Sequence, residues 1–251
     1  MDNDIEYKLI KADTSISDFV ERFWMLVNHS EQGKEMVIMP DGRIDIFFSY
    51  DATEPFHITL MGLETQPNPA TLPPKSVTFA VNLKLLAIEY LLDTTISTLL
   101  NEAKRLPPDF WGITKEDLDD FESFCTKVSD KIRELLQTKV DARKQKLFDL
   151  IYASNGSLTV KELSEQVYWT SRQINRYFNQ QFGISLKAYC NILRFRASFQ
   201  HIKDGRLFPE QNFTDQAHFI KAIKKLSGVI PKELAKNKND RFIQFSTLPK
   251  E

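Results

Sequence analysis

The sequence predicts a mixed α+β fold: an antiparallel β sandwich or barrel, then a linker helix, then an all-α region. Short β-branched and aromatic segments fill residues 1–90, a helical periodicity runs from Thr114, and the charge changes sign between the two halves. Of the 251 residues, 42% are hydrophobic, which suffices for two cores of ordinary size. We expect a β-rich region over 1–112, a linker or dimerisation helix over 113–140 and a helical domain over 141–251.

Four segments of the first region predict strands, because they are short, apolar and partly alternating. They are Met36–Met39, Arg43–Phe48, Phe56–Met61 and Ser76–Val81. The sequence Pro40-Asp41-Gly42 predicts a turn, since Pro presets φ and Gly permits a positive φ. The strands on either side of it could form a core hairpin. The stretch 66–74 has four prolines and predicts a loop, and Phe19, Phe23 and Trp24 predict core positions.

Arg43 and Asp45 alternate with apolar neighbours, so they share one face of their predicted strand. That face could line a pocket, but we expect it to be exposed. His57 has no second His or carboxylate spaced as a metal site requires. We therefore expect no metal and no cofactor in this region.

A helical stripe follows the β-rich region. The segment 96–104 could form one short helix, and the pattern from Thr114 to about Lys139 is strongly helical, with apolar residues spaced three and four apart. The stripe consists of Leu118, Phe121, Cys125, Val128, Ile132 and Leu135. Such a heptad seam favours either a dimer contact or packing within the chain, and the sequence leaves both open.

The charge is divided unevenly along the chain. Before Lys139 lie 13 of the 33 Lys and Arg residues and 24 of the 34 Asp and Glu residues. The first part therefore has a net charge of −11 and the second part +10. Such asymmetry indicates that the C-terminal part meets a polyanion such as nucleic acid, although a basic surface can also serve solubility alone.

Two capping boxes predict a helix-turn-helix in the basic half. Thr159 is followed three residues later by Glu162, and Thr170 by Gln173. Gly183 is placed to end the second helix. Two short helices with a tight connection form the helix-turn-helix arrangement.

The second of these helices presents two different faces. Ile174, Phe178 and Phe182 point inward at helical spacing. The outer face has no acidic residue and consists of Arg172, Asn175, Arg176 and Asn179. Because Arg pairs with guanine and Asn with adenine in the major groove, this face favours DNA over an ordinary solvated surface.

Two segments of the basic half resemble the signatures of AraC/XylS-type transcription regulators. The first match lies within 158–193, at Leu163, Ser164, Ser171, Ile174, Arg176, Phe178, Asn179, Gly183, Ser185 and Tyr189. The second lies within 213–231, at Phe213, Asp215, Gln216, His218, Phe219, Lys224, Gly228 and Pro231. The resemblance implies two helix-turn-helix units joined by a long helix, here from Ser185 to about Ile202, and a cupin-like N-terminal sensor domain.

The resemblance also implies which residues contact DNA. The candidate base-reading residues are Arg172, Asn175, Arg176, Gln216 and Lys221. The candidate phosphate contacts are Ser171, Asn179, Lys187, Lys224 and Lys225. His218 is interpreted as structural rather than as a metal ligand. The family has an extra helix before the second signature, whereas Gly205 and Pro209 disfavour one here, so the second unit is expected to be degenerate.

The expected function is that of a sequence-specific, effector-responsive DNA-binding regulator that inserts helices at 171–182 and 215–227 into the major groove. Expected partners are double-stranded DNA and a second copy of the chain, with a small effector and RNA polymerase as further candidates. The alternatives are an interaction protein with a degenerate helix-turn-helix domain and an enzyme whose β region carries the chemistry. The recognised catalytic motifs are absent from the sequence, so we expect no enzyme.

A cytoplasmic location is expected. No apolar run approaches the ~20 residues that span a bilayer, the acidic N-terminus lacks a signal-peptide core, and Cys125 and Cys190 are lone thiols that suit a reducing compartment.

Overall fold

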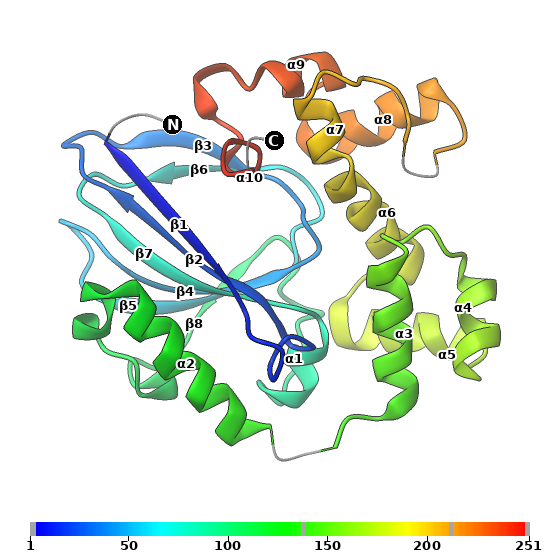
Figure 1. Cartoon of the computed structure of the whole chain (residues 1–251), viewed down its shortest axis with the longest axis horizontal. Helices are drawn as coiled ribbons and strands as arrows, with labels where there is room; N and C mark the ends of the chain where they lie inside the picture. The colour runs from blue at the N-terminus through cyan, green and yellow to red at the C-terminus, as the bar shows by residue number, and fades with distance from the viewer. Residues whose placement is uncertain (1–3, 137–138, 211–212, 249–251) are drawn as a thin grey trace.

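A computed structural model describes residues 4–136, 139–210 and 213–248. The chain begins as an antiparallel β region and continues as helices, which confirms the predicted α+β fold class (Figure 1). None of the described helices is long and apolar enough to cross a bilayer.

The β region contains two antiparallel sheets. The larger has the strand order β1 (Ile5–Lys11), β2 (Val20–Asn28), β7 (Val77–Leu83), β4 (Ile44–Tyr50), β5 (His57–Met61) and β8 (Ala103–Arg105). The smaller pairs β3 (Lys34–Ile38) with β6 (Asn68–Leu72). The four segments predicted as strands all contain one, and β7 lies in the middle of the larger sheet between β2 and β4.

Three local predictions in this region are wrong. The strands before and after the Gly42 turn do not form a hairpin, because β3 and β4 belong to different sheets. The proline-rich stretch 66–74 contains β6, and Pro69 is tolerated because a strand of a two-stranded sheet has one edge that needs no partner. The segment 96–104 forms turns over 96–101 rather than a helix, and its end begins β8, which pairs with β5.

The heptad stripe lies inside the chain. The capping box at Thr114 begins a short 3₁₀ helix (Lys115–Asp119), and helix α2 (Phe121–Leu135) begins after Asp120. The Phe124 ring lies 5.3 Å from both Phe48 and Phe79 of the larger sheet. Because the stripe is covered by the protein's own sheet, packing within the chain is the correct alternative, and the expectation of dimerisation through this stripe is wrong.

The helical region consists of short elements. After α1 (Leu86–Tyr90) and α2 come α3 (Ala142–Ala153), α4 (Val160–Val167), α5 (Ser171–Phe182), α6 (Leu186–Ala197), α7 (Phe199–Lys203), α8 (Gln216–Ser227), α9 (Pro231–Lys236) and α10 (Ile243–Ser246), with 3₁₀ turns at Phe110–Gly112 and Lys238–Asp240. The single helix predicted from Ser185 to Ile202 is interrupted at Ser198, whose hydroxyl donates to the Arg194 carbonyl at 2.9 Å.

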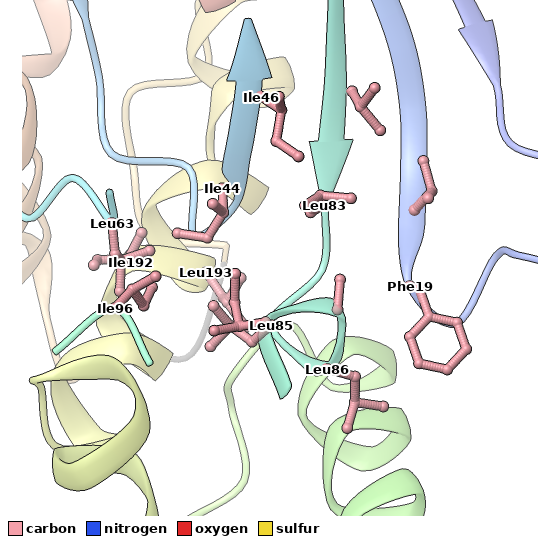
Figure 2. Packing of buried hydrophobic residues seen from close by; sticks show 14 of the residues in the cluster. Phe19, Ile44, Ile46, Leu63, Leu83, Leu85, Leu86, Ile96, Ile192 and Leu193 are labelled. Atoms are coloured by element: carbon pink, nitrogen blue, oxygen red, sulfur yellow. The ribbon is translucent and has the colours of Figure 1, made fainter. Parts of the chain in front are cut away.

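The turn before β4 is where helix α6 meets the β region. Gly42 has a φ of 75°, as the turn prediction requires, and a Cβ on it would come within 2.8 Å of the Leu193 side chain. The Tyr189 hydroxyl donates to the Gly42 carbonyl at 2.9 Å. Ile192 and Leu193 lie among side chains of the β region, and the buried residues of both parts form one continuous core (Figure 2).

The C-terminal segment returns to the β region. Phe242 and Phe245 are buried, and Phe242 forms a parallel bridge with Val37 at β3. The Gln244 side chain accepts from the Met39 amide at 3.0 Å and donates to the Met39 carbonyl at 2.9 Å. Helix α10 therefore lies over the smaller sheet, although it follows the helical domain in sequence (Figure 1).

The burial of α2 gives the first testable prediction. Ile132→Ala removes a fully buried side chain and should lower the free energy of unfolding by about 2–5 kcal/mol. Urea denaturation measures this change. The exposed Ser123→Ala on the same helix should leave stability almost unchanged; an Ile132→Ala protein as stable as this control would contradict the packing of the stripe.

Candidate nucleic-acid interface and a cavity in the β region

Helices α4 and α5 form the predicted helix-turn-helix, and both capping boxes are present. The Thr159 hydroxyl accepts from the Glu162 amide at 3.2 Å, and the Thr170 hydroxyl accepts from the Gln173 amide at 3.2 Å. Tyr168 adopts the left-handed conformation (φ 55°) at the turn between the helices. The start of each helix is therefore set by residues within its own first turn.

The inward face of α5 anchors the helix in the core. Ile174, Phe178 and Phe182 are fully buried, and the Phe148 ring of α3 lies 5.8 Å from Phe178 and 6.0 Å from Phe182. Gly183 ends the helix at a φ of 74°. This packing holds α5 rigidly and turns its opposite face outward.

The outward face of α5 carries the four predicted polar residues. Arg172, Arg176 and Asn179 are exposed and Asn175 is half-buried. Within the described ranges no carboxylate forms an ion pair with either arginine. The Asn175 amide donates to the Ser171 carbonyl at 3.0 Å, and that of Asn179 to the Asn175 carbonyl at 2.9 Å. The arginines are thus free for a ligand, whereas each asparagine would exchange an intrahelical bond for one to DNA.

The other two phosphate candidates of this unit lie at opposite ends of it. Ser171 begins α5 and is half-buried, with its hydroxyl 3.4 Å from that of Ser164 on α4. Lys187 is exposed in the first turn of α6, beyond the C-terminal end of α5. Lys187 and Arg172 therefore lie on different helices, each in the first turn.

The second unit retains its recognition helix, and the described residues directly before it form no helix, as Gly205 and Pro209 predict. Residues 204–210 form no helix, and 211–212 lie outside the described residues. On α8 the exposed candidates are Gln216, Lys221, Lys224 and Lys225. The Gln216 amide donates to the Leu207 carbonyl at 2.8 Å, so this side chain holds the preceding loop.

His218 lies in the first turn of α8. Its ring nitrogen Nδ1 accepts from the Thr214 amide at 3.3 Å, which is the structural position that the sequence predicts. Among the residues that the structure describes, no cluster of His, Cys, Asp or Glu could hold a metal ion.

A cavity of about 270 Å³ lies in the β region, between the larger sheet, the smaller sheet and α10. Its apolar lining includes Trp24, Leu26, Met36 and Phe47, and its polar lining includes Arg22, Asp41, Asp45 and Asn82. The C-terminal segment contributes Ile243, Gln244 and Thr247. The sequence did not predict this cavity, because its walls come from strands far apart in the chain and from the tail.

The expectation that Arg43 and Asp45 are exposed is wrong. Asp45 faces the cavity, where its Oδ1 accepts from Trp24 Nε1 at 3.0 Å and from Asn82 Nδ2 at 2.9 Å. Burial raises the pKa of Asp45 to about 7, and the neighbouring Asp41 carboxylate adds to the rise. Alternation along a strand shows which residues share a face, but not what covers that face.

Arg43 is only 8% exposed and forms an ion pair with Glu21. The same carboxylate accepts from Arg196 of α6, with Nη1 at 3.0 Å. Burial alone would raise the pKa of Glu21, but the two guanidinium groups outweigh it and hold this pKa well below its usual range. The Arg43 guanidinium also lies 4.5 Å from the centre of the Tyr152 ring on α3.

Comparisons with known proteins give one family match and several structural likenesses. Residues 8–104 match a family described as a domain of unknown function, DUF6597. The comparison with curated proteins found no match.

Among solved structures, ToxT from Vibrio cholerae O395 is 13% identical with a TM-score of 0.43, over 92% of this chain and 97% of that chain. ToxT from V. cholerae strain SCE256 with a bound unsaturated fatty acid is 12% identical with a TM-score of 0.40, over 94% and 96%. The C-terminal domain of AraT, a response regulator from Geobacillus stearothermophilus, is 17% identical with a TM-score of 0.34, over 40% and 89%. These values are too low to bear on function.

The raised pKa of Asp45 predicts how stability depends on pH. Because the folded protein holds this proton more tightly than the unfolded chain, the contribution of Asp45 to stability falls as the pH rises from about 4 to about 7. Asp45→Asn keeps the acceptor for Trp24 and Asn82 and should remove this dependence. At pH 8 the variant should be more stable than the wild type by an amount on the order of a few kcal/mol, and at pH 4 the two should be similar.

Chemical denaturation at both pH values measures the difference. Asp93→Asn, an exposed position away from the cavity, serves as the control. A wild type that gains stability relative to Asp45→Asn between pH 4 and pH 8 would contradict the burial of this carboxyl.

Proposed function

We propose that the protein is a sequence-specific DNA-binding transcription regulator of the AraC/XylS type, responsive to a small effector and without catalytic activity. The observation that carries the proposal is the outer face of α5, a capped and core-anchored helix that presents Arg172 and Arg176 without ionic partners among the described residues. Arginines in this setting form bidentate contacts with guanine.

The exposed part of α5 is the part that recognition helices use. Such helices contact base edges with their N-terminal residues, and Arg172 lies in the first turn. The C-terminal end of α5 is instead held by the β region, where the Ile96 amide donates to the Gln181 carbonyl at 2.9 Å. We infer that the first unit approaches DNA with its start pointing into the groove and its end fixed to the protein.

The second unit supports DNA binding through charge. Lys221, Lys224 and Lys225 are exposed on α8, and phosphate contacts of this kind add affinity without sequence preference. We assign most of the specificity to α5, because Gln216 is engaged with the loop before α8.

Effector response is proposed from the cavity in the β region. Its walls include residues of the C-terminal segment that follows α9, and α9 in turn packs against α8. A ligand in the cavity would therefore contact the C-terminal segment, which is joined along the chain to α9 and, through the packing of α9, to α8 of the second unit.

A second copy of the chain, RNA polymerase and a cytoplasmic location remain part of the proposal. The surface for a second copy must lie elsewhere than the buried stripe of α2. The missing helix of the second unit favours one other function, that of an interaction protein which no longer binds DNA. The DNA-binding experiment below separates the two.

The central prediction concerns Arg172 and Arg176. DNA is first selected from a random-sequence pool with the full-length protein, and the affinity for an enriched sequence is then measured by fluorescence anisotropy at physiological salt. The double variant Arg172→Ala with Arg176→Ala should lose about 1–3 kcal/mol for each base contact removed.

The matched control is Lys8→Ala with Lys11→Ala, which removes two positive charges from exposed positions at β1. It should bind the selected sequence almost as the wild type does. If the pool yields no enriched sequence, the interaction-protein alternative replaces the regulator. If a sequence is enriched but both double variants bind it alike, the assignment of base reading to Arg172 and Arg176 is wrong.

A further prediction concerns phosphate contact by α8. Lys224→Ala should weaken binding to selected and random DNA alike, because phosphates carry no sequence information. It should also reduce the slope of log K against log salt concentration by about 0.9, the value for one phosphate contact. An unchanged slope would show that α8 does not touch the DNA backbone at this residue.

A further inference from the structure

We propose that the cavity of the β region binds a small organic cation, an amine or guanidine with an apolar body, whose head is held by Asp45 and Asn82. The site is inferred from the cavity alone; only its role as the effector site rests on the proposed function.

The first argument is an unmet acceptor. Asn82 is 1% exposed and lines the cavity. Its amide nitrogen donates to Asp45 at 2.9 Å, which fixes the orientation of the amide and leaves Oδ1 as a buried acceptor without a partner in the structure. A buried acceptor without a donor is unfavourable by about 1–3 kcal/mol, so a donating ligand head is favoured next to it.

The second argument is the balance of charge. Carboxylates lining the cavity come from four residues, Asp41, Asp45, Asp51 and Glu54, against the one guanidinium of Arg22 and the imidazole of His57. Arg22 already lies 3.7 Å from Asp41. Glu54 is paired with Arg105, which lies outside the lining. Asp45 and Asp51 remain beyond the pair of Arg22 with Asp41, so the cavity is net acidic when Asp45 is ionised and favours a cationic head over an anionic one.

Arg22 nevertheless defines the competing occupant. Its Nε is buried and has no hydrogen-bond partner among the residues that the structure describes, so an anionic head could accept from this donor. The experiment below therefore compares a cation and an anion with the same apolar body.

The body of the ligand is set by the apolar lining. The Trp24 and Phe47 rings lie 5.2 Å apart in an edge-to-face arrangement beside Asp45. Aromatic faces next to a carboxylate suit an ammonium or guanidinium group, which gains from cation–π contact. The volume of about 270 Å³ lies near the lower limit of ligand pockets, about 300–1,000 Å³, so the ligand is small.

The C-terminal segment that closes the cavity explains how ligand binding would reach the second unit. Ile243, Gln244 and Thr247 belong to the C-terminal segment, and Gln244 is fastened to the Met39 backbone by two hydrogen bonds. A ligand that contacts the C-terminal segment would stabilise the packing of that segment against β3. Because α10 follows α9 closely, the ligand also favours one position of α8.

Calorimetric titration of the full-length protein tests the site. The probes are 2-phenylethylamine and agmatine as cations, 2-phenylethanol as a neutral analogue and 3-phenylpropanoate as an anion. We expect saturable binding of at least one cation, and weaker binding of the alcohol and the anion. Asp45→Asn should reduce the affinity for the cation roughly 10- to 150-fold, as for a lost hydrogen bond to a charged group, whereas Asp93→Asn should not change it.

The pH dependence supplies a second readout. The affinity for the amine should rise between pH 6 and pH 8, because the pKa of Asp45 is raised to about 7 and only its ionised form pairs with a cation. The other titratable or charged groups that line the cavity are Tyr7, Arg22, Asp41, Tyr50, Asp51, Glu54 and His57. If Asp45 causes the increase in amine affinity, the increase disappears in Asp45→Asn. If the increase persists in that variant, another group causes it and the assignment to Asp45 is wrong.

Three results would overturn the proposal: no binding of either cation, tighter binding of 3-phenylpropanoate than of 2-phenylethylamine, or unchanged amine affinity in Asp45→Asn. Asn82→Ala, which should also weaken amine binding, guards against a misfolded first variant. The selection of DNA is carried out without any amine. If the cation site fails, the DNA-binding result still stands. If the protein binds the amine but selects no DNA, the cation site stands and the proposed regulator function fails.

Discussion

The arrangement of the two halves depends on one carboxylate, that of Glu21, which is shared by Arg43 and Arg196. Glu21 lies in β2, Arg43 immediately before β4 and Arg196 in α6, so the three side chains tie two strands of the larger sheet to the helix that links the recognition units. A charged side chain removed from water is unfavourable unless it is paired. Separating the two halves would therefore leave Glu21, Arg43 or Arg196 without its partner or exposed to water. The close packing of α6 on Gly42 occurs beside this ion pair and reinforces it.

This joint has a consequence for both functional sites. It holds α6 against the β region, and a backbone hydrogen bond from Ile96 to Gln181 holds the C-terminal end of α5 there as well. The first recognition helix is therefore a rigid part of one continuous core rather than a domain on a flexible tether. The second unit meets the β region through the C-terminal segment instead, and that segment also closes the cavity. The unit without a helix directly before its recognition helix is thus the one connected to the cavity.

The two units differ in how they are stabilised. In the first, capping boxes define both helices and three buried side chains anchor the recognition helix. In the second, α8 is capped by Asp215, but the residues described before it form a loop held by the Gln216 side chain. Helix α8 nevertheless buries Phe219 and Ile223 fully and packs against α6 and α9, so the two units differ in the element before the recognition helix and not in whether that helix is packed.

Interactions between residues three or four apart were enough to predict the helix-turn-helix, the start and end of α5 and the identity of its outer face. Each depends on a cap or on helical periodicity, and both act within a few residues. The same local reasoning failed for Arg43, Asp45 and β6, and it left open what covers the stripe of α2. Their surroundings come from strands and helices distant in the chain, and a pattern along one element cannot show what will cover it. The cavity and the seat of α10 on β3 belong to this second group, because they exist only where residues 7–82 and 243–247 meet.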